Sequence, residues 1–223
     1  MTKGKLFVLE GACDGIGKST QYQELANHLQ RLDYLIKTHH FPSYNTYQAK
    51  AVEEYLKGTF GNPKDLSPYF VNSLYATDRA ITWNESLKSE YEAGKIILLD
   101  RYTTSSLIYQ SALIQDEEEK KKFIDYICDL EYNKLGIKKP DLVIYLYASY
   151  ENIKKLRENR KENEGIKKDI HESNDEFLKK VYENGNFVAN YLGWEKVKCD
   201  TKDEMLAIEE IHDKVYSLVK THL

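Results

Sequence analysis

The sequence predicts an α/β protein in which a parallel sheet is covered by helices on both faces. Short apolar runs recur along the chain, and stretches with helical periodicity separate them, which is typical of alternating strands and helices. The first apolar run also leads through a glycine-rich loop straight into a helical pattern. We find no internal repeat and no linker rich in proline, glycine and serine, so we expect residues 1–223 to form one domain.

Five strands are expected, and the first of them is a short apolar run bounded by Gly11, as in a buried parallel strand. The second begins at Leu35-Ile36 and is stopped by Phe41-Pro42, and the third ends on Asp100. The other expected strands lie at residues 5–9, 142–147 and, more weakly, 197–199.

Helices are expected between these strands. In the first of them, apolar residues recur near the i, i+3, i+4, i+7 spacing that places them on one helix face, at Tyr22, Leu25, Ala26, Leu29 and Leu32. Further helices are expected at residues 120–130, 175–191 and 205–219.

Composition narrows the functional classes. The chain has 32 Lys+Arg, 36 Asp+Glu, a formal net charge of -4 and 41% hydrophobic residues, which excludes a disordered or collagen-like chain. An acidic protein has no general attraction for nucleic acid or anionic lipid, so we expect neither as a partner. No apolar run approaches the roughly 18–20 residues of a membrane span, and the run before Glu10 is too short for a signal peptide. The three cysteines form no CxxC pair, which favours a reducing, cytoplasmic location.

A phosphate-binding loop is predicted between the first strand and the first helix, at Gly11-Ala12-Cys13-Asp14-Gly15-Ile16-Gly17-Lys18-Ser19-Thr20. Glycines let backbone N–H groups turn toward a polyphosphate, and the helix N-terminus adds a partial positive charge. In such a loop the lysine reaches the terminal phosphates and the following hydroxyl binds Mg²⁺, which are the roles expected of Lys18 and Ser19.

The spacing of this loop departs from the usual G-x₄-G-K-[ST] pattern. Five residues, rather than four, separate Gly11 from Gly17. Either the loop carries a one-residue bulge before Asp14, or Ala12 takes the place of the first glycine, which is unfavourable if that position needs a positive φ.

An acidic and a basic residue follow the third strand. If this strand neighbours the first, Asp100 lies at the carboxyl edge of the sheet beside the phosphate-binding loop, where open α/β sheets bind ligands. Its carboxylate suits Mg²⁺, and Arg101 suits a phosphate group. The remaining histidines, His39-His40 among them, form no metal-binding pattern and are expected to be structural.

At this point the sequence resembles the thymidylate kinases in the order and spacing of motifs along nearly the whole chain. These motifs are Asp14-Gly15-x-Gly17-Lys18-Ser19-Thr20-Gln21, Phe41-Pro42-x-Tyr44, Leu74-Tyr75-Ala76-x-Asp78-Arg79, Asp100-Arg101-Tyr102 with Ser105, and Asp169-x-x-Glu172. The resemblance implies the three-layer P-loop fold with a five-stranded parallel sheet and a short basic lid at about residues 157–170. It implies transfer of the γ-phosphoryl group of ATP to dTMP, with Mg²⁺, in dTTP biosynthesis, and a homodimer.

The resemblance also implies which residues act. The catalytic set is Lys18, Asp100, Arg101, Arg157 and Arg160. The ATP-binding set is Gly11, Cys13, Asp14, Gly15, Ile16, Gly17, Lys18, Ser19 and Thr20. The dTMP-binding set is Asp14, Phe41, Tyr44, Tyr75, Arg79, Arg101, Ser105, Ser106, Tyr109 and His171. The metal would be held by Ser19, Asp100 and Glu172.

Within the dTMP set, the resemblance places each residue against one part of the nucleotide. Tyr75 would stack on thymine, Arg79 would donate to its O4 atom, and Ser106 falls where relatives contact N3. Arg101 and Tyr44 would hold the phosphate. Asp14 would bind the sugar 3′-hydroxyl, and Tyr109 would sense the 2′ position.

A lid-borne cation is expected because the phosphate-binding loop has no arginine between Gly11 and Lys18. Arg157, Arg160 and Lys161 share one helix face and could neutralise charge on the transferring phosphoryl group. Two alternatives remain open. One is a kinase of the same fold that acts on another deoxynucleotide or a deoxynucleoside, and the other is a nucleotide-binding switch without phosphoryl transfer.

Overall fold

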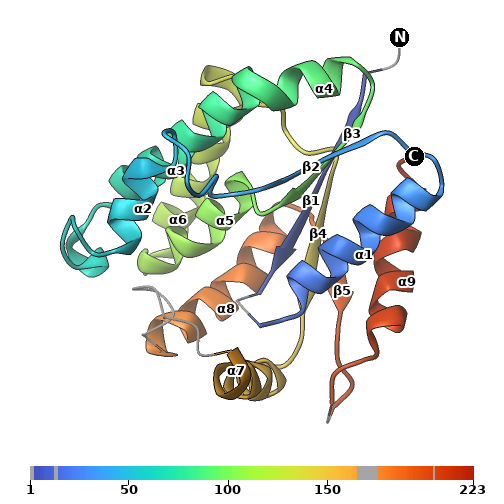
Figure 1. The fold of residues 1–223 in the computed structure, drawn as a ribbon. Coiled ribbons are helices and arrows are strands. Elements are labelled where there is room, and N and C mark those ends of the chain that lie inside the picture. The colour runs from blue at the N-terminus through green and yellow to red at the C-terminus, as the bar shows by residue number, and fades with distance from the viewer. Residues whose placement is uncertain (1–2, 13–14, 165–174, 203) are drawn as a thin grey trace.

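A parallel sheet with strand order β2-β3-β1-β4-β5 runs through the centre of the computed structural model (Figure 1). The model describes residues 3–12, 15–164, 175–202 and 204–223, with only the backbone described at 64, 159–164 and 175. Within these residues the five strands are β1 (Lys5–Gly11), β2 (Ile36–His40), β3 (Ile96–Asp100), β4 (Leu142–Tyr147) and β5 (Glu195–Lys198). The predicted five-stranded parallel sheet is therefore confirmed.

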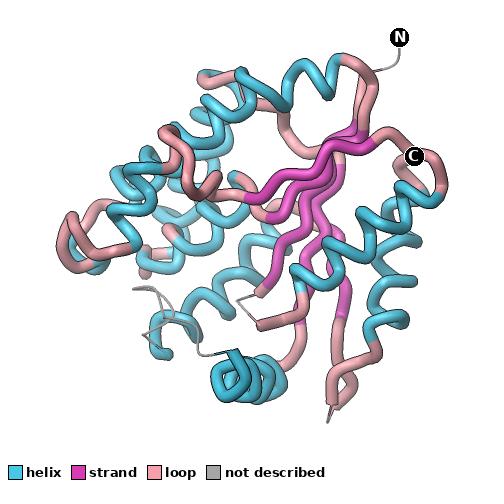
Figure 2. Tube along the Cα trace, viewed as in Figure 1, coloured by secondary structure: helices cyan, strands magenta, loops and turns pink. Residues whose placement is uncertain are grey.

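Helices lie on both sides of the strands, as Figure 2 shows. Those of the described chain are α1 (Lys18–Arg31), α2 (Lys50–Leu56), α3 (Pro68–Thr82), α4 (Lys88–Glu92), α5 (Thr103–Tyr109), α6 (Glu117–Cys128), α7 (Tyr150–Glu164), α8 (Asp175–Tyr191) and α9 (Ile208–Lys220). Two π-helical turns, Trp83–Leu87 and Asp129–Lys134, follow α3 and α6. The helix expected at 120–130 thus starts three residues earlier and changes its winding after Cys128.

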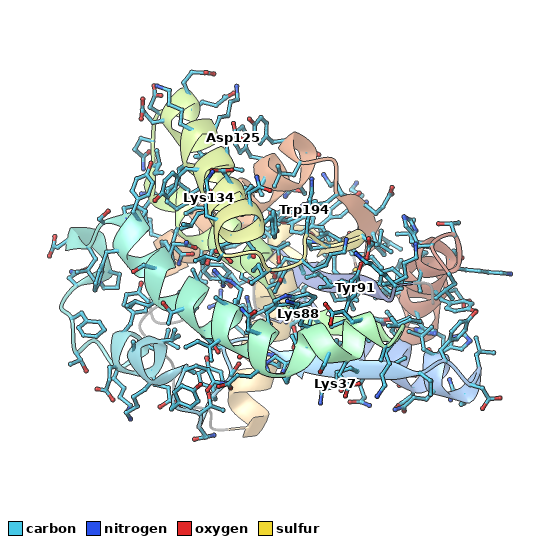
Figure 3. All side chains as sticks on the ribbon, turned by 90° about the horizontal axis from the view of Figure 1, so that it is seen from above. Lys37, Lys88, Tyr91, Asp125, Lys134 and Trp194 are labelled. Atoms are coloured by element: carbon cyan, nitrogen blue, oxygen red, sulfur yellow. The ribbon has the colours of Figure 1, made fainter. Side chains whose placement is uncertain are left out.

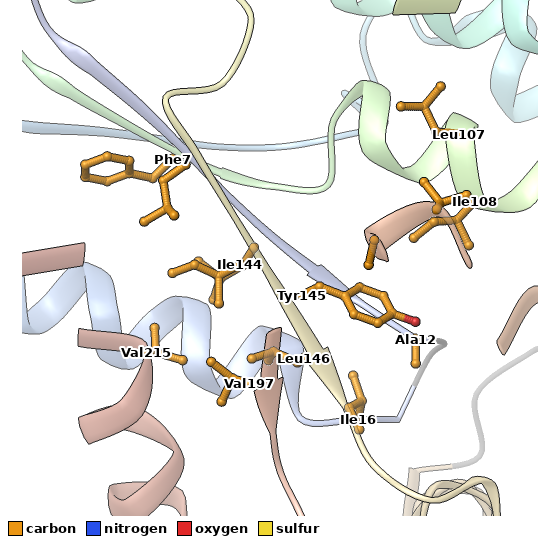
Figure 4. Packing of buried hydrophobic residues seen from close by; sticks show 14 of the residues in the cluster. Phe7, Ala12, Ile16, Leu107, Ile108, Ile144, Tyr145, Leu146, Val197 and Val215 are labelled. Carbon is orange, nitrogen blue, oxygen red and sulfur yellow. The ribbon is translucent and has the colours of Figure 1, made fainter. Parts of the chain in front are cut away.

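The two faces of the sheet pack against different helices because side chains alternate along each strand. Phe7 and Leu9 of β1 belong to a core cluster that includes Leu25 of α1 and Val215 of α9. Leu6 and Val8 join a second cluster with Trp83 and other residues of the opposite helical layer. Figure 4 shows Ile144 and Tyr145 of β4 pointing to opposite sides of the strand, and both belong to the first cluster.

The register of the sheet determines where the functional site forms. In the parallel pairing of β1 with β3, Leu9 lies opposite Asp100. The carboxyl ends of these two strands therefore meet at one edge, and Asp100 lies beside the loop that follows β1. This confirms the neighbouring position expected for Asp100.

The outer sides of the helices carry charged side chains, among them the exposed Lys88, Asp125 and Lys134 (Figure 3). Among the described helices, none combines the length and the apolar character needed to cross a membrane.

Helix α8 packs very closely against the sheet. A Cβ atom added at Gly185 would lie 3.2 Å from Cζ of Tyr145 and closer still to its hydroxyl oxygen. Tyr145 is fully buried in β4 and has no room to move away. The glycine therefore permits the close approach of α8 to the sheet.

We expect Gly185→Ala to destabilise the protein by about 1–2 kcal/mol, because overpacking costs more than the roughly 1 kcal/mol gained in helix propensity. Denaturant unfolding measures the change. Adding Tyr145→Phe, which removes the closest clashing atom, should recover part of the loss. If Gly185→Ala instead stabilises the protein, α8 does not pack against Tyr145 as described.

Candidate active site

A cavity of about 390 Å³ opens at the carboxyl edge of the sheet. It is bordered by the start of α1 and by the segments that follow β2 and β3, together with α3 and α5. All eight described residues of the expected dTMP-binding set line it: Phe41, Tyr44, Tyr75, Arg79, Arg101, Ser105, Ser106 and Tyr109. Lys18 and Ser19 line it as well.

The phosphate-binding loop has the backbone conformation that its glycines permit. Gly15 and Gly17 have φ values of 94° and 86°, a region that side chains disfavour. Ala12 is not among the residues with positive φ, and its N–H donates to the carbonyl of Leu146 at 3.0 Å. Ala12 therefore does not adopt the positive φ that would be unfavourable for it. Cys13 and Asp14 lie outside the described residues, so the possible bulge before Asp14 stays a prediction.

An ionic cluster joins the loop to the end of β3. The Lys18 ammonium group forms an ion pair with Asp100, whose other oxygen lies 2.9 Å from Nδ1 of His40. Burial alone would raise the pKa of Asp100, but the hydrogen bond with His40 and the charge of Lys18 outweigh it and hold that pKa below its ordinary value. Burial, and next the nearby Arg101, lower the pKa of Lys18. Asp100 therefore remains a carboxylate.

Arg101 has a positive φ of 66°, which is uncommon for a residue with a long side chain. Its Nη1 atom lies 3.4 Å from the hydroxyl of Ser105 and 3.8 Å from Glu10, and its guanidinium lies over the ring of Tyr109. Left-handed residues of this kind are often found at functional sites. Here the conformation directs Arg101 into the cavity.

Glu10 is a fully buried carboxylate at the end of β1. It accepts hydrogen bonds from the hydroxyls of Thr104 and Ser105, at 2.9 and 2.6 Å, and from the N–H of Gly11 at 3.0 Å. It thereby links the first strand to the N-terminus of α5 and balances the charge of Arg101.

Tyr75, Arg79 and Ser106 also line the cavity. Arg79 projects from α3, and its Nη2 atom donates to the hydroxyl of Ser106 at 2.9 Å. The same guanidinium forms two hydrogen bonds of 2.7 Å with Glu131, a buried acid that follows α6. Arg79 is thus held rigidly in the cavity wall.

Asp78 of α3 fixes the turn that follows β2. Its carboxylate accepts a hydrogen bond of 2.8 Å from the backbone N–H of Ser43. Phe41 is buried against Tyr102, and Tyr44 is half-exposed and stacks on His40. The turn therefore holds Phe41 and Tyr44 against the cavity.

The lid residues are only partly described. Arg157 lies on α7 and is buried, and its Cγ atom would be 2.6 Å from a Cβ atom added at Gly15. Its side chain therefore covers the phosphate-binding loop. The side chain of Arg160, and the whole of His171, Glu172 and lid residues 165–170, lie outside the described residues.

Three site residues were not found from the sequence. In the sequence, Glu10 and Glu131 look like ordinary carboxylates at a strand end and in a helix. His40 was expected to be structural, yet it lines the cavity and contacts Asp100. For Glu10 the available signal was an acid that directly follows an apolar run, since buried charges are rare unless they are paired.

The cavity thus combines basic groups that suit a phosphate with an aromatic ring and hydrogen-bonding groups that suit a flat base, which is the combination of a P-loop nucleotide kinase. The chain belongs to the thymidylate kinase family: the family model described as Thymidylate kinase matches residues 9–214.

Individual relatives agree with this assignment. A thymidylate kinase of Thermoanaerobacter sp. (strain X514) is 30% identical over 223 residues, covering 99% of this chain and 100% of that protein. The putative thymidylate kinase 251L of Invertebrate iridescent virus 6 is 30% identical over 155 residues, which are 68% of this chain and 64% of that protein.

The fold is shared with a solved thymidylate kinase structure from Candida albicans. The TM-score is 0.73 at 24% identity, over 99% of this chain and 92% of that one. The family assignment makes this protein an ATP-dependent kinase that converts dTMP to dTDP in nucleotide biosynthesis.

Proposed function

We propose that dTMP binds in this cavity with its phosphate near Lys18 and Arg101 and its base at Tyr75, Arg79 and Ser106. The observation that supports this placement is that one cavity collects residues from α1, α3, α5 and the turn after β2. In this placement Lys18 and Arg101 would form the phosphate end, and the aromatic ring with its neighbouring hydrogen-bond donors would form the base end.

The base end offers complementary contacts. The ring of Tyr75 provides a face for stacking on thymine, and Tyr55 supports it edge-on at 6.2 Å between ring centres. Arg79 supplies N–H donors for a carbonyl oxygen of the base, and the hydroxyl of Ser106 can donate or accept. A cytosine amino group would face donors instead, which disfavours dCMP.

Phosphoryl transfer in this site depends on positioning and charge. The acceptor phosphate is already anionic, so no strong general base is required. Lys18 would contact the terminal phosphates of ATP, and Arg101 would hold the acceptor phosphate in line with them. Arg157, lying over the phosphate-binding loop, is placed to neutralise charge that develops between the two nucleotides.

The residues present fit a magnesium ion. Asp100 at the end of β3 and Ser19 in the cavity wall supply hard oxygen ligands beside the loop. Within the described chain, no group of three or more His, Cys, Asp or Glu residues is arranged to hold a metal by itself. Mg²⁺ is commonly held by one or two carboxylates together with substrate phosphates. Bound with ATP, it would supply charge neutralisation at the β- and γ-phosphates.

We also propose a cytoplasmic homodimer. The cysteines Cys128 and Cys199 are free thiols, as expected in a reducing compartment.

The rings of Tyr69 and Phe70 on α3 and of Tyr126 on α6 are each 41–51% exposed, and Tyr69 contacts Tyr126. An aromatic surface of this kind suits contact with a second copy.

Lys18→Ala should lower turnover by about 10³-fold, because the phosphate charge loses its preorganised cation. A coupled assay of ADP formation with dTMP and ATP·Mg²⁺ measures the loss. Lys122→Ala, at an exposed lysine of α6, serves as the control and should be fully active. Activity of Lys18→Ala within tenfold of the wild type would refute the assignment of the loop.

Arg101→Ala should raise the KM for dTMP by about tenfold or more, because a charged hydrogen bond to the acceptor phosphate is lost. The wild type should prefer dTMP over dUMP, dCMP, UMP and thymidine as acceptors. Any slow reaction with thymidine, which has no phosphate, should not change in the variant. Arg31→Ala at the exposed end of α1 is the matched control.

A wild type that prefers thymidine would indicate a nucleoside kinase, and ATP binding without acceptor-dependent turnover would indicate a switch.

Tyr126→Glu should convert the dimer to a monomer, because a carboxylate replaces a ring that is 51% exposed at the proposed interface. Sedimentation equilibrium measures the mass of the wild type and the variant. Asp125→Asn, one residue away on α6, provides a control that should remain dimeric. A wild type that is monomeric at micromolar concentration would contradict the proposal.

A further inference from the structure

Glu131 is a fully buried carboxylate whose contacts converge on one ligand-facing cation. Its Oε2 atom accepts from Nε of Arg79 and its Oε1 atom from Nη2 of Arg79, both at 2.7 Å. The hydroxyl of Thr103 donates to Oε2 at 2.8 Å. Paired, planar contacts of this kind fix the orientation of a guanidinium group.

The position of Glu131 arises from the winding of the chain after α6. The π-helical turn Asp129–Lys134 contains it, and the carbonyl of Glu131 accepts from the N–H of Ile137 at 3.1 Å. Glu131 and Arg79 are 52 positions apart in the chain, so the pair joins the helical turn after α6 to α3. π-helical turns are often found at functional sites.

The pair determines which donor Arg79 can offer. Nε and Nη2 are occupied by Glu131, and Nη2 also by Ser106. Among the described residues, Nη1 has a single long hydrogen bond, 3.4 Å to the carbonyl of Tyr102. Because Arg79 also lines the cavity, Nη1 is the nitrogen with the most remaining capacity to bind a ligand.

The pair also determines the charge of this end of the cavity. An unpaired guanidinium in a cavity of about 390 Å³ would attract a phosphate group. Paired with Glu131, Arg79 presents hydrogen-bond donors with no net charge. Burial alone would lower the pKa of Arg79, but the charge of Glu131 raises it, so Arg79 stays protonated.

We propose that Glu131 is the positioning residue of acceptor recognition: it orients Arg79 toward the base and cancels its charge, so that the acceptor phosphate binds near Lys18 and Arg101 and not at Arg79. This inference rests on the proposed function, in which Arg79 contacts the base. Glu131 itself touches no substrate and acts through Arg79.

The test compares Glu131→Gln with the wild type. The amide keeps the size of the side chain but removes its charge. We expect the KM for dTMP to rise by about tenfold and the KM for ATP to change less than about twofold, because only base recognition is disturbed. Inorganic phosphate should become a stronger competitor of dTMP, since the uncompensated Arg79 then binds anions.

Two further variants separate positioning from support of the fold. Arg79→Met should raise the KM for dTMP, and the double variant Arg79→Met/Glu131→Gln should have the same KM as Arg79→Met, because Glu131 has nothing left to position. Asp200→Asn is the control. It neutralises another buried acid, one that accepts bonds from Ser149 and Asn152, and should lower the Tm without changing the KM for dTMP.

The outcomes are distinct. A KM for Glu131→Gln equal to that of the wild type, with a raised KM for Arg79→Met, overturns this inference and leaves the proposed function intact. An unchanged KM for Arg79→Met overturns the proposed base contact itself. If Glu131→Gln does not fold, the double variant still tests the inference, because a KM above that of Arg79→Met overturns it.

Discussion

Charge pairing at the carboxyl edge of the sheet is the constraint on which the site depends. Within the described residues the cavity carries Lys18, Arg79 and Arg101, and each has a carboxylate partner: Asp100, Glu131 and Glu10. An uncompensated buried charge costs several kcal/mol, so the cations can be kept in a cavity only if acids are brought to them. The parallel register supplies one such acid directly, because it places Asp100 opposite Leu9, whose chain continues into the phosphate-binding loop.

The pairs differ in how easily a ligand can separate them. Arg101 lies 3.8 Å from Glu10 and its side chain is 16% exposed, so a phosphate group can approach it from the cavity. Arg79 forms two hydrogen bonds of 2.7 Å with a carboxylate that no solvent reaches. The first cation can therefore exchange its partner for substrate, while the second keeps its partner and offers only its remaining donors. This asymmetry distinguishes the phosphate end from the base end.

The sequence predicted the parts of this arrangement that depend on local patterns. Apolar runs marked the strands, and glycines followed by Lys18 marked the phosphate-binding loop, since both signals lie within a few residues of the feature that they encode. The position of Asp100 needed one further assumption, that β3 neighbours β1, and the register confirms it. Glu131 could not be found in this way, because its partner Arg79 is distant in the chain and a π-helical turn interrupts the periodicity after Cys128. His40 was missed because only the pairing of β2 with β3 brings it to Asp100.

The contact between Arg157 and Gly15 joins α7 to the phosphate-binding loop. Helix α7 follows β4, and β4 pairs with β1, whose chain continues into the phosphate-binding loop. The sheet therefore brings the segment that leads into α7 next to the loop. Gly15 leaves room for the stem of Arg157, since a Cβ atom there would be 2.6 Å from its Cγ atom. A side chain at position 15 would thus disturb both partners at once, because its positive φ of 94° disfavours any other residue and the added atom would displace Arg157. Gly15 therefore permits both the turn of the phosphate-binding loop and the close approach of Arg157 to it.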